Sequence, residues 1–207
     1  MKRSGCKSFP LFLAIIGLLS WGLTGQVTAA PKSEKLFDGK DLLKWRVPNP
    51  NPYWQVVEGV LVGENDPQNK GSVLYTQKEY KDFVFECEAR WEGEIDSGFF
   101  VRNPELQVQL GVSRSLQKDM TCSFYTGGKE KYPEAAQAKG FEKILKPGKW
   151  NQYKIEAKGD TFTVYLNGRQ VSQFTDAKYS KAAPIGLQIH PGLPMKVEFR
   201  KIRVREL

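Results

Sequence analysis

Apolar and polar residues alternate along much of this chain, and that alternation constrains its fold more than any other feature. In the segment "DFVFECEARW" the apolar set comprises Phe83, Phe85, Cys87, Ala89 and Trp91. Successive side chains of a β-strand point to opposite faces of the sheet, so this spacing predicts a strand with one buried face. Helical periodicity is nearly absent, apart from "EAAQAK", which is ambiguous and compatible with one helical turn. The chain is therefore predicted to be all-β.

Turn signals between the alternating segments indicate how the strands connect. Asn167-Gly168 separates the two arms of "TFTVYLNGRQVSQF" and is the strongest short signal for a hairpin. The preceding segment, "WNQYKIEAKGD", extends that hairpin into an antiparallel meander. The final segment, "MKVEFRKIRVREL", predicts a last strand with a bulge near Arg200 and Lys201, and with inward residues Val197, Phe199, Ile202 and Val204. Further strands are predicted at residues 53–63, 72–76, 97–102, 106–112 and 184–190. Antiparallel strands in this number favour a sandwich or jelly roll.

The first residues have the features of a targeting segment. A basic start is followed by an apolar run from Phe9 to Leu23 and by the small-residue signal Val27-Thr28-Ala29. We predict a signal peptide over residues 1–29, a polar lead-in over 30–35 and one domain over 36–207. The alternative is a retained membrane anchor, but the apolar run is short for a span. The protein is thus expected to be exported to the periplasm, cell envelope or extracellular space, with no stable membrane span after cleavage.

Charge and cysteine content bear on which ligands, metals and disulfides the chain is expected to have. The formal net charge is +8, but Lys and Arg alternate with Glu along most segments. Because no basic stripe accompanies stacking aromatics, nucleic acid is not an expected partner. Beyond the targeting segment, the cysteines are Cys87 and Cys122; a buried free thiol is favoured over a disulfide between them. No metal-ligand spacing is present, so no cofactor is identified and a divalent metal stays open, as does the oligomeric state.

Strand faces that point away from the core carry a distinctive set of polar residues. Gln107 and Gln109 share one such face, Gln188 and His190 share another, and Asp96 and Arg102 lie together on a third. Amide side chains offer both a donor and an acceptor to sugar hydroxyls. The alternative is an ordinary solvated face. The irregular loop "FYTGGKEKYPEA" is expected to border the resulting groove, with Tyr125 and Tyr132 exposed.

His190 is the only histidine of the chain and the best single candidate for general acid or base chemistry. The alternative is a structural residue at a strand end. Neither of two common hydrolase patterns accompanies it. No Gly-x-Ser-x-Gly elbow is present. The acid-x-acid-x-x-acid pattern of retaining glucanases begins with Glu94 and Asp96 but has Phe99 in its third place, which argues against that mechanism.

Several segments in order along the chain resemble one known family. They are "LFDGKDLLKW", "WQVVEGVLVGE", "DSGFFVR", "KWNQYKIEAKGDTFTVYLNGRQV" and "GLQIH…VEFRKIRVREL". Together they resemble the 3-keto-disaccharide hydrolase domain family, in the exported form of planctomycete-type bacteria. The resemblance implies an all-β, concanavalin A-like or glucanase-type jelly-roll sandwich of antiparallel sheets. It also implies cleavage of glycosides that carry a ketone at C3, by β-elimination followed by hydration.

The family's motifs give expectations for individual residues. The "SGxFxR" motif corresponds to Ser97, Gly98, Phe100 and Arg102, and "QxH" corresponds to Gln188 and His190. We therefore expect His190 and Arg102 to be catalytic, and a sugar-binding set formed by Asp96, Ser97, Gln107, Gln109, Tyr125 and Gln188. The chain departs from the family where Gln107 replaces a frequent Glu, for which Glu105, Glu64 or Asp66 would have to compensate. That departure favours the alternative function, a non-catalytic carbohydrate-binding jelly roll of the cell envelope.

Overall fold

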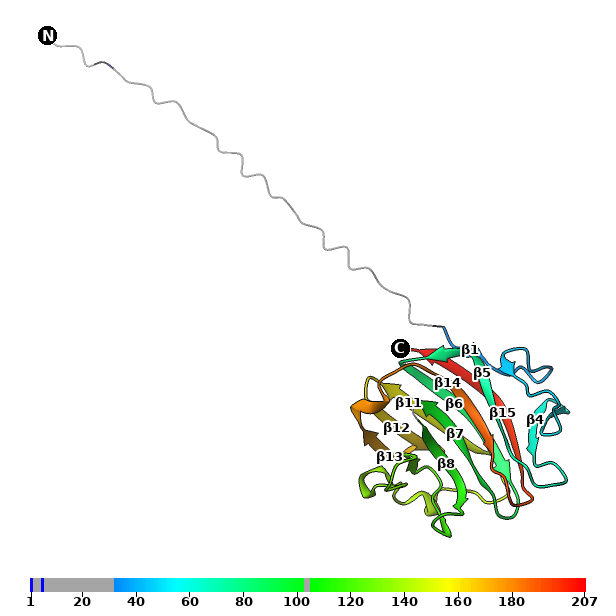
Figure 1. Cartoon of the computed structure of the whole chain (residues 1–207). Coiled ribbons are helices and arrows are strands. Elements are labelled where there is room, and N and C mark those ends of the chain that lie inside the picture. Colours follow the sequence, from blue (N-terminus) through cyan, green and yellow to red (C-terminus); the bar gives the residue numbers. More distant parts are fainter. Residues whose placement is uncertain (2–4, 6–31, 103–104) are drawn as a thin grey trace. The chain divides into compact units, whose positions relative to one another are not determined.

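The computed structural model describes residues 1, 5, 32–102 and 105–207. The predicted signal peptide lies almost entirely outside the described residues. The chain divides into two units, Met1–Ala30 and Pro31–Leu207, and the second is a β-sandwich (Figure 1). Within the described part of the chain, no helix is long and apolar enough to cross a membrane.

Two antiparallel sheets form the sandwich. The first sheet has the order β13 (Arg169–Thr175), β12 (Thr161–Leu166), β11 (Asn151–Lys158), β6 (Phe83–Trp91), β15 (Lys196–Glu206), β4 (Val60–Glu64) and β3 (Trp54–Val57), with β1 (Glu34–Lys35) also paired to β15. The second sheet has the order β10 (Phe124–Tyr125), β8 (Leu106–Ser113), β7 (Asp96–Arg102), β14 (Ala183–Ile189), β5 (Ser72–Tyr80) and β2 (Trp45–Arg46), with β9 (Lys118–Asp119) paired to β8. Short 3-10 turns are η1 (Glu134–Ala136), η2 (Phe141–Lys143) and η3 (Ala177–Tyr179).

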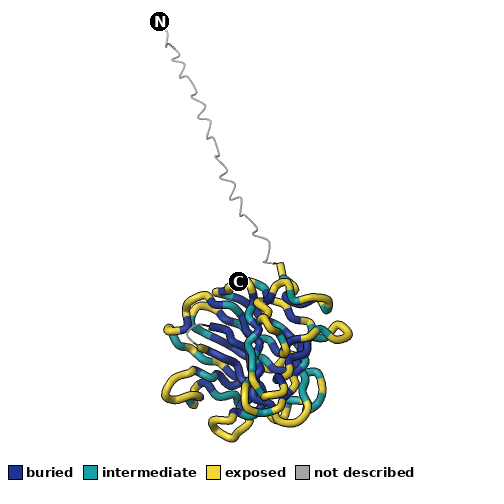
Figure 2. The backbone as a smooth tube through the Cα atoms, turned by 45° about the vertical axis from the view of Figure 1, so that its right-hand side comes forward, coloured by how far each residue is buried: buried dark blue, intermediate teal, exposed yellow. Residues whose placement is uncertain are grey.

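An aromatic cluster joins the two sheets. Buried residues, dark blue in Figure 2, run through the middle of the domain. Phe99 on β7 of the second sheet lies 5.5 Å, between ring centroids, from Phe85 on β6 and 5.5 Å from Tyr153 on β11. It also lies 6.1 Å from Phe199 on β15. Burying each such ring contributes about 2 to 3 kcal/mol. Because Phe99 is fixed inward, its neighbours Gly98 and Phe100 must face outward on β7.

Three of the alternation-based predictions are confirmed. The meander is formed by β11, β12 and β13, and the sandwich is antiparallel as expected. The predicted bulge in β15 is present as a register shift between Arg200 and Arg203, with Lys201 at a φ of 53°. This extra residue keeps Ile202 and Val204 on the buried side.

Three details differ from or refine the expectation. Residues 53–63 are not one strand, because Glu58 and Gly59 have φ values of 50° and 80° and turn the chain between β3 and β4. The "EAAQAK" stretch forms the short η1 turn. Part of the predicted lead-in is ordered as β1 and pairs with β15.

Cys87 and Cys122 are both free and buried, so the free-thiol interpretation is confirmed. Burial raises the pKa of each thiol.

Candidate functional site

A groove of about 390 Å³ lies on the outer face of the second sheet, over β8, β7 and β14. Six of the residues predicted from sequence line it together: Asp96, Gln107, Gln109, Tyr125, Gln188 and His190. Other lining residues that bear on its chemistry are Glu105, Arg114, Lys131 and Tyr132. The groove thus gathers residues from separate parts of the chain.

The centre of the groove depends on Gly98. Cross-strand pairing places Gly98 between Gln188 on β14 and Gln109 on β8. A Cβ atom at Gly98 would overlap the Nε2 atom of Gln107, which occupies the space above the glycine. The absence of a side chain on β7 therefore lets the amides of β8 and β14 meet across it.

Gln107 joins those amides as a donor. Its Nε2 donates to the carbonyl oxygen of Ser97 at 3.1 Å, to Gln109 Oε1 at 3.2 Å and to Gln188 Oε1 at 2.9 Å. The Ser97 carbonyl can only accept, so the nitrogen of the Gln107 amide must face inward. Gln107 is 3% exposed, which makes these bonds part of a desolvated network.

Gln109 transmits the network to a carboxylate and a phenol. Its Nε2 donates to Asp96 Oδ1 at 2.8 Å, and its Oε1 accepts from the Tyr132 hydroxyl at 2.9 Å. Asp96 Oδ2 also accepts the backbone N–H of Arg114 at 3.0 Å. Each oxygen of Asp96 thus accepts one bond from the protein, and this carboxylate holds Gln109 and the main chain of Arg114 in place at the edge of the groove.

His190 follows the last residue of β14 at one end of the groove. Its Nδ1 lies 2.7 Å from the carbonyl oxygen of Pro191. A carbonyl oxygen can only accept, so Nδ1 carries the proton of this bond. In the neutral imidazole the other nitrogen, Nε2, then has a free lone pair. The main chain of His190 is fixed as well, because its carbonyl accepts Asn65 Nδ2 at 2.9 Å.

Arg114 lies beside this imidazole. Its Nη1 donates to the same Pro191 carbonyl at 3.1 Å, so this nitrogen and His190 Nδ1 are at most about 6 Å apart. Gly192 leaves room for the guanidinium, which a Cβ at that residue would displace. The groove thus presents a cation next to a group able to accept a proton.

Two tyrosines from the irregular loop border the groove, as predicted. The rings of Tyr125 and Tyr132 meet edge to face with centroids 5.4 Å apart. Burial raises the pKa of both phenols; Glu105 and Asp96 add to the effect at Tyr125. Both are therefore neutral hydrogen-bonding groups near neutral pH. Tyr132 is 6% exposed, so the expectation that it would be exposed was wrong.

Charged residues lie at both ends of the groove. Glu105 precedes β8, whereas His190 follows the strand residue Ile189, which is paired with Ser97 next to Asp96. Asp96 pairs with Gly111, six positions along β8 from Glu105, a separation of about 20 Å. The groove therefore extends from Glu105 at one end to Asp96, Arg114 and His190 at the other, with amides between.

Arg102 does not join this groove, which corrects the expectation from sequence. Pairing between β7 and β8 shifts register between Phe100 and Arg102, so Arg102 opposes the core residue Leu106. The extra residue turns the side chain off the face that carries Asp96 and Phe100. The catalytic role assigned to Arg102 therefore loses its geometric basis.

The Arg102 guanidinium is enclosed by the fold. It donates to the backbone carbonyls of Tyr179 at 2.8 Å, Val101 at 3.1 Å and Lys81, and it lies between the rings of Phe83 and Phe162. Its side chain is 0% exposed, and Asp82 is 3.8 Å away. Burial lowers the pKa of Arg102 to about 10, partly opposed by Asp82. These contacts tie several chain segments together and are structural.

Ser97 is also placed differently from the expectation. It alternates inward with Phe99 on β7, is fully buried, and donates its hydroxyl to the Gln188 carbonyl at 2.6 Å. Ser97 thus fixes β14 against β7 instead of contacting a ligand. The residues that sequence reasoning did not assign are Arg114, in a turn after β8, and Tyr132. Only the loop composition pointed to Tyr132, and no periodic signal marks Arg114.

Among the residues that the structure describes, no group of three or more His, Cys, Asp or Glu side chains is arranged to hold a metal ion. The groove is lined by amides and phenols together with the carboxylates of Asp96 and Glu105 and the cations Arg114 and Lys131, a mixture of donors and acceptors that suits hydrogen bonding to a polar ligand.

Comparison with solved structures identifies the fold. Two crystal structures of proposed glycosyl hydrolases from Parabacteroides distasonis are similar to this chain. The first has 26% sequence identity and a TM-score of 0.59, and 84% of each chain is covered. The second has 22% identity and a TM-score of 0.61, and the match covers 84% of this chain and 94% of the other. The carbohydrate-binding module CBM66 from Bacillus subtilis is 18% identical with a TM-score of 0.51, over 79% of this chain and 96% of the module. These likenesses support the jelly-roll sandwich predicted from sequence.

No significant match was found among curated protein sequences. A family model, in contrast, matches residues 32–205, which include every described strand of the sandwich except the last residue of β15. The chain belongs to the family of 3-keto-alpha-glucoside-1,2-lyase-like domains.

Proposed function

We propose that the groove binds and cleaves a glycoside whose sugar carries a ketone at C3. The observation that carries this proposal is His190, whose Nε2 has a free lone pair beside a guanidinium at the end of an amide-lined groove. Family membership and the likeness to proposed glycosyl hydrolases and to a carbohydrate-binding module support a sugar ligand.

The first step assigned to this site is proton removal. The ketone at C3 acidifies the C2 proton, which His190 Nε2 takes as a general base. The C–H electron pair moves toward C3 and forms an enolate, whose oxygen is stabilised by the Arg114 guanidinium. Arg114 thereby takes the role that the sequence had suggested for Arg102.

The second step breaks the glycosidic bond. The enolate electrons form a C1=C2 double bond, the C1–O bond breaks, and the leaving oxygen takes the proton that His190 had accepted, which restores the neutral imidazole. Water then adds across the double bond, so the net reaction is hydrolysis. Throughout, the Gln188 amide and the Tyr125 hydroxyl hold sugar hydroxyls, while Gln107 and Gln109 fix the amide in place.

The test uses a matched pair of substrates. The purified protein is incubated with a 3-keto-disaccharide and with the same disaccharide unoxidised, and release of free sugar is followed. We expect release from the ketone only, reduced at least a hundredfold in His190→Ala. Arg114→Ala should also be impaired, whereas Arg169→Ala, an exposed arginine at the β12–β13 hairpin, should match wild type. Equal cleavage of both disaccharides would contradict the elimination mechanism.

A second function is favoured by one observation. Gln107 stands where the family often has a Glu, so the centre of the groove holds an amide in place of that carboxylate. A non-catalytic carbohydrate-binding domain needs no carboxylate there. Tight binding of the 3-keto-disaccharide without release of sugar would support this alternative and reject the enzyme proposal.

A further inference from the structure

A second hollow continues the groove on the same face of the second sheet. Its volume is about 280 Å³, and its lining residues are Tyr75, Phe100, Glu105, Ala183 and Pro184. Arg102 contributes only main-chain atoms to the lining, because its side chain is 0% exposed. Glu105 lines both this hollow and the groove, so the two are contiguous. The second hollow differs in its side chains, because two aromatic rings and Pro184 stand beside Glu105 where the groove has amides.

An aromatic pair is built into this hollow by a glycine. Gly186 on β14 pairs with Tyr75 on β5 and with Phe100 on β7, which places the three residues in one row across the sheet. The two rings lie 5.9 Å apart between centroids, with an interplanar angle of 50°. A Cβ at Gly186 would come 2.7 Å from Tyr75 Cε1, so only glycine lets the ring settle there.

The aromatic pair is partly exposed to solvent through Tyr75. Phe100 is 6% exposed and supports the half-buried Tyr75 from within the sheet. Burial raises the pKa of Tyr75, and the nearby Glu105 raises it further, so its ring stays a neutral phenol. A neutral aromatic surface beside Pro184 suits a ring with an apolar face, which includes the C–H face of a sugar.

The distance from His190 fits one substrate spanning both hollows. The row of Tyr75, Gly186 and Phe100 lies four positions along β14 from His190, or about 13 Å. That separation is comparable with the length of a disaccharide. We propose that the second hollow is the leaving-group subsite, and that it selects glycosides whose leaving alcohol carries a ring over those with a small acyclic one. This inference rests on the proposed function for the identity of the leaving group.

The experiment compares two substrates that differ only in the leaving alcohol. Values of kcat/KM are measured for cyclohexyl and methyl 3-keto-glucosides, both of which release simple alcohols. Wild type should favour the cyclohexyl substrate, and Tyr75→Ala should reduce that preference roughly tenfold. Tyr75→Phe, which keeps the ring, should retain the preference. The matched control is Tyr165→Ala, a half-buried tyrosine on the outer face of the first sheet, which should retain both the preference and the activity.

A binding measurement separates failure of this inference from failure of the proposed function. If wild type cleaves neither substrate, the proposed function is wrong, and saturation-transfer NMR with unoxidised cyclohexyl glucoside decides the subsite. We expect saturation of the cyclohexyl protons in wild type and Tyr165→Ala, and its loss in Tyr75→Ala. An unchanged substrate preference in an active Tyr75→Ala variant, or no Tyr75-dependent saturation, would overturn the subsite.

Discussion

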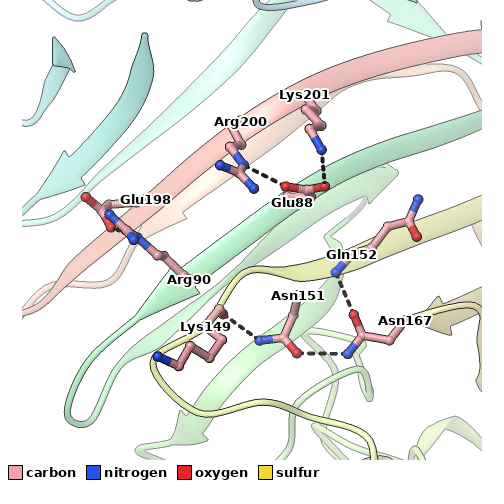
Figure 3. Close-up of polar contacts among 9 residues, drawn as sticks. All are labelled: Glu88, Arg90, Lys149, Asn151, Gln152, Asn167, Glu198, Arg200 and Lys201. Atoms are coloured by element: carbon pink, nitrogen blue, oxygen red, sulfur yellow. Dashed lines mark hydrogen bonds and ion pairs between the residues drawn. The ribbon is translucent and has the colours of Figure 1, made fainter. Parts of the chain in front are cut away.

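The outer faces of the two sheets carry different kinds of polar side chain. On the first sheet, Glu88 accepts Arg200 Nε at 2.6 Å and Lys201 Nζ at 2.7 Å, and Arg90 pairs with Glu198 (Figure 3). On the second sheet, neutral amides are buried and hydrogen-bonded to each other beneath a groove. One face is a solvated network of ion pairs, and the other is a preorganised polar surface.

This difference shows why charge alone does not locate a binding site in a sandwich. Arg90, Arg200 and Lys201 on the first sheet are paired with carboxylates. Arg90 and Arg200 also both stack on Trp150, at 4.6 and 4.1 Å from its ring centroid. The Trp150 indole is therefore covered by two arginines of the same chain. On the second sheet, Tyr125 and Gln188 remain partly exposed above a fixed network and are free to meet a ligand.

The largest expected effect concerns Arg102, which belongs to the interior and to neither face. Arg102→Ala removes donors from three buried or partly buried carbonyls and leaves a cavity between aromatic rings. We expect a loss of about 3 kcal/mol or more in the free energy of unfolding, measured by urea denaturation. Arg169→Ala should stay within about 0.5 kcal/mol of wild type. A fully stable Arg102→Ala protein that had lost sugar release would instead restore the catalytic role predicted from sequence.

An intermediate effect is expected at the centre of the groove. Gln107→Glu would replace a donor by a carboxylate facing the Ser97 carbonyl and the acceptor oxygens of Gln109 and Gln188. Gln109 cannot reverse its amide without losing its bonds to Asp96 and Tyr132. We expect destabilisation by about 1 to 3 kcal/mol in thermal or urea unfolding.

The control for that substitution lies on the other sheet. Gln55→Glu changes an exposed glutamine of β3 and should alter the free energy of unfolding by less than about 0.5 kcal/mol. If both variants were equally stable, the buried amide network would not distinguish the two faces, and the comparison would fail.

The smallest effect is expected for the ion pairs of the first sheet. Burial acts to raise the pKa of Glu88, but hydrogen bonds from Lys201 and Arg200 outweigh it, and the net pKa is lowered. A lowered carboxyl pKa contributes stability above the pKa of the unfolded chain, and that stability is lost as the pH falls through the folded pKa. Glu88→Gln should therefore cost about 0.5 to 1 kcal/mol at pH 7 and nothing at strongly acidic pH, as followed by urea midpoints. A cost that was independent of pH would contradict this account.

The fold was predictable because alternation reports directly on strand faces. That pattern identified the core residues of β6, the meander and the bulge in β15, and the same pattern grouped Gln107, Gln109 and Gln188. The family resemblance is confirmed by the match over residues 32–205, and the sugar chemistry that it implies stays a proposal.

The errors arose where alternation is interrupted. One extra residue in the pairing of β7 with β8 moved Arg102 to the interior, and nothing in "DSGFFVR" announces that shift. Arg114 lies in a turn, where residue order does not fix side-chain direction. Its position beside His190 depends on Pro191 and Gly192, which come from a loop distant in sequence.

The central claim, that His190 acts as the base on the amide-lined face, is tested most directly by proton exchange. The probe is 3-keto-1,5-anhydroglucitol, which has the acidic C2 proton but no leaving group at C1, so exchange is observed without elimination. Incubated in D₂O and followed by NMR, wild type should exchange the C2 proton at least a hundredfold faster than His190→Ala. Equal exchange rates in the two proteins would show that His190 is not the base.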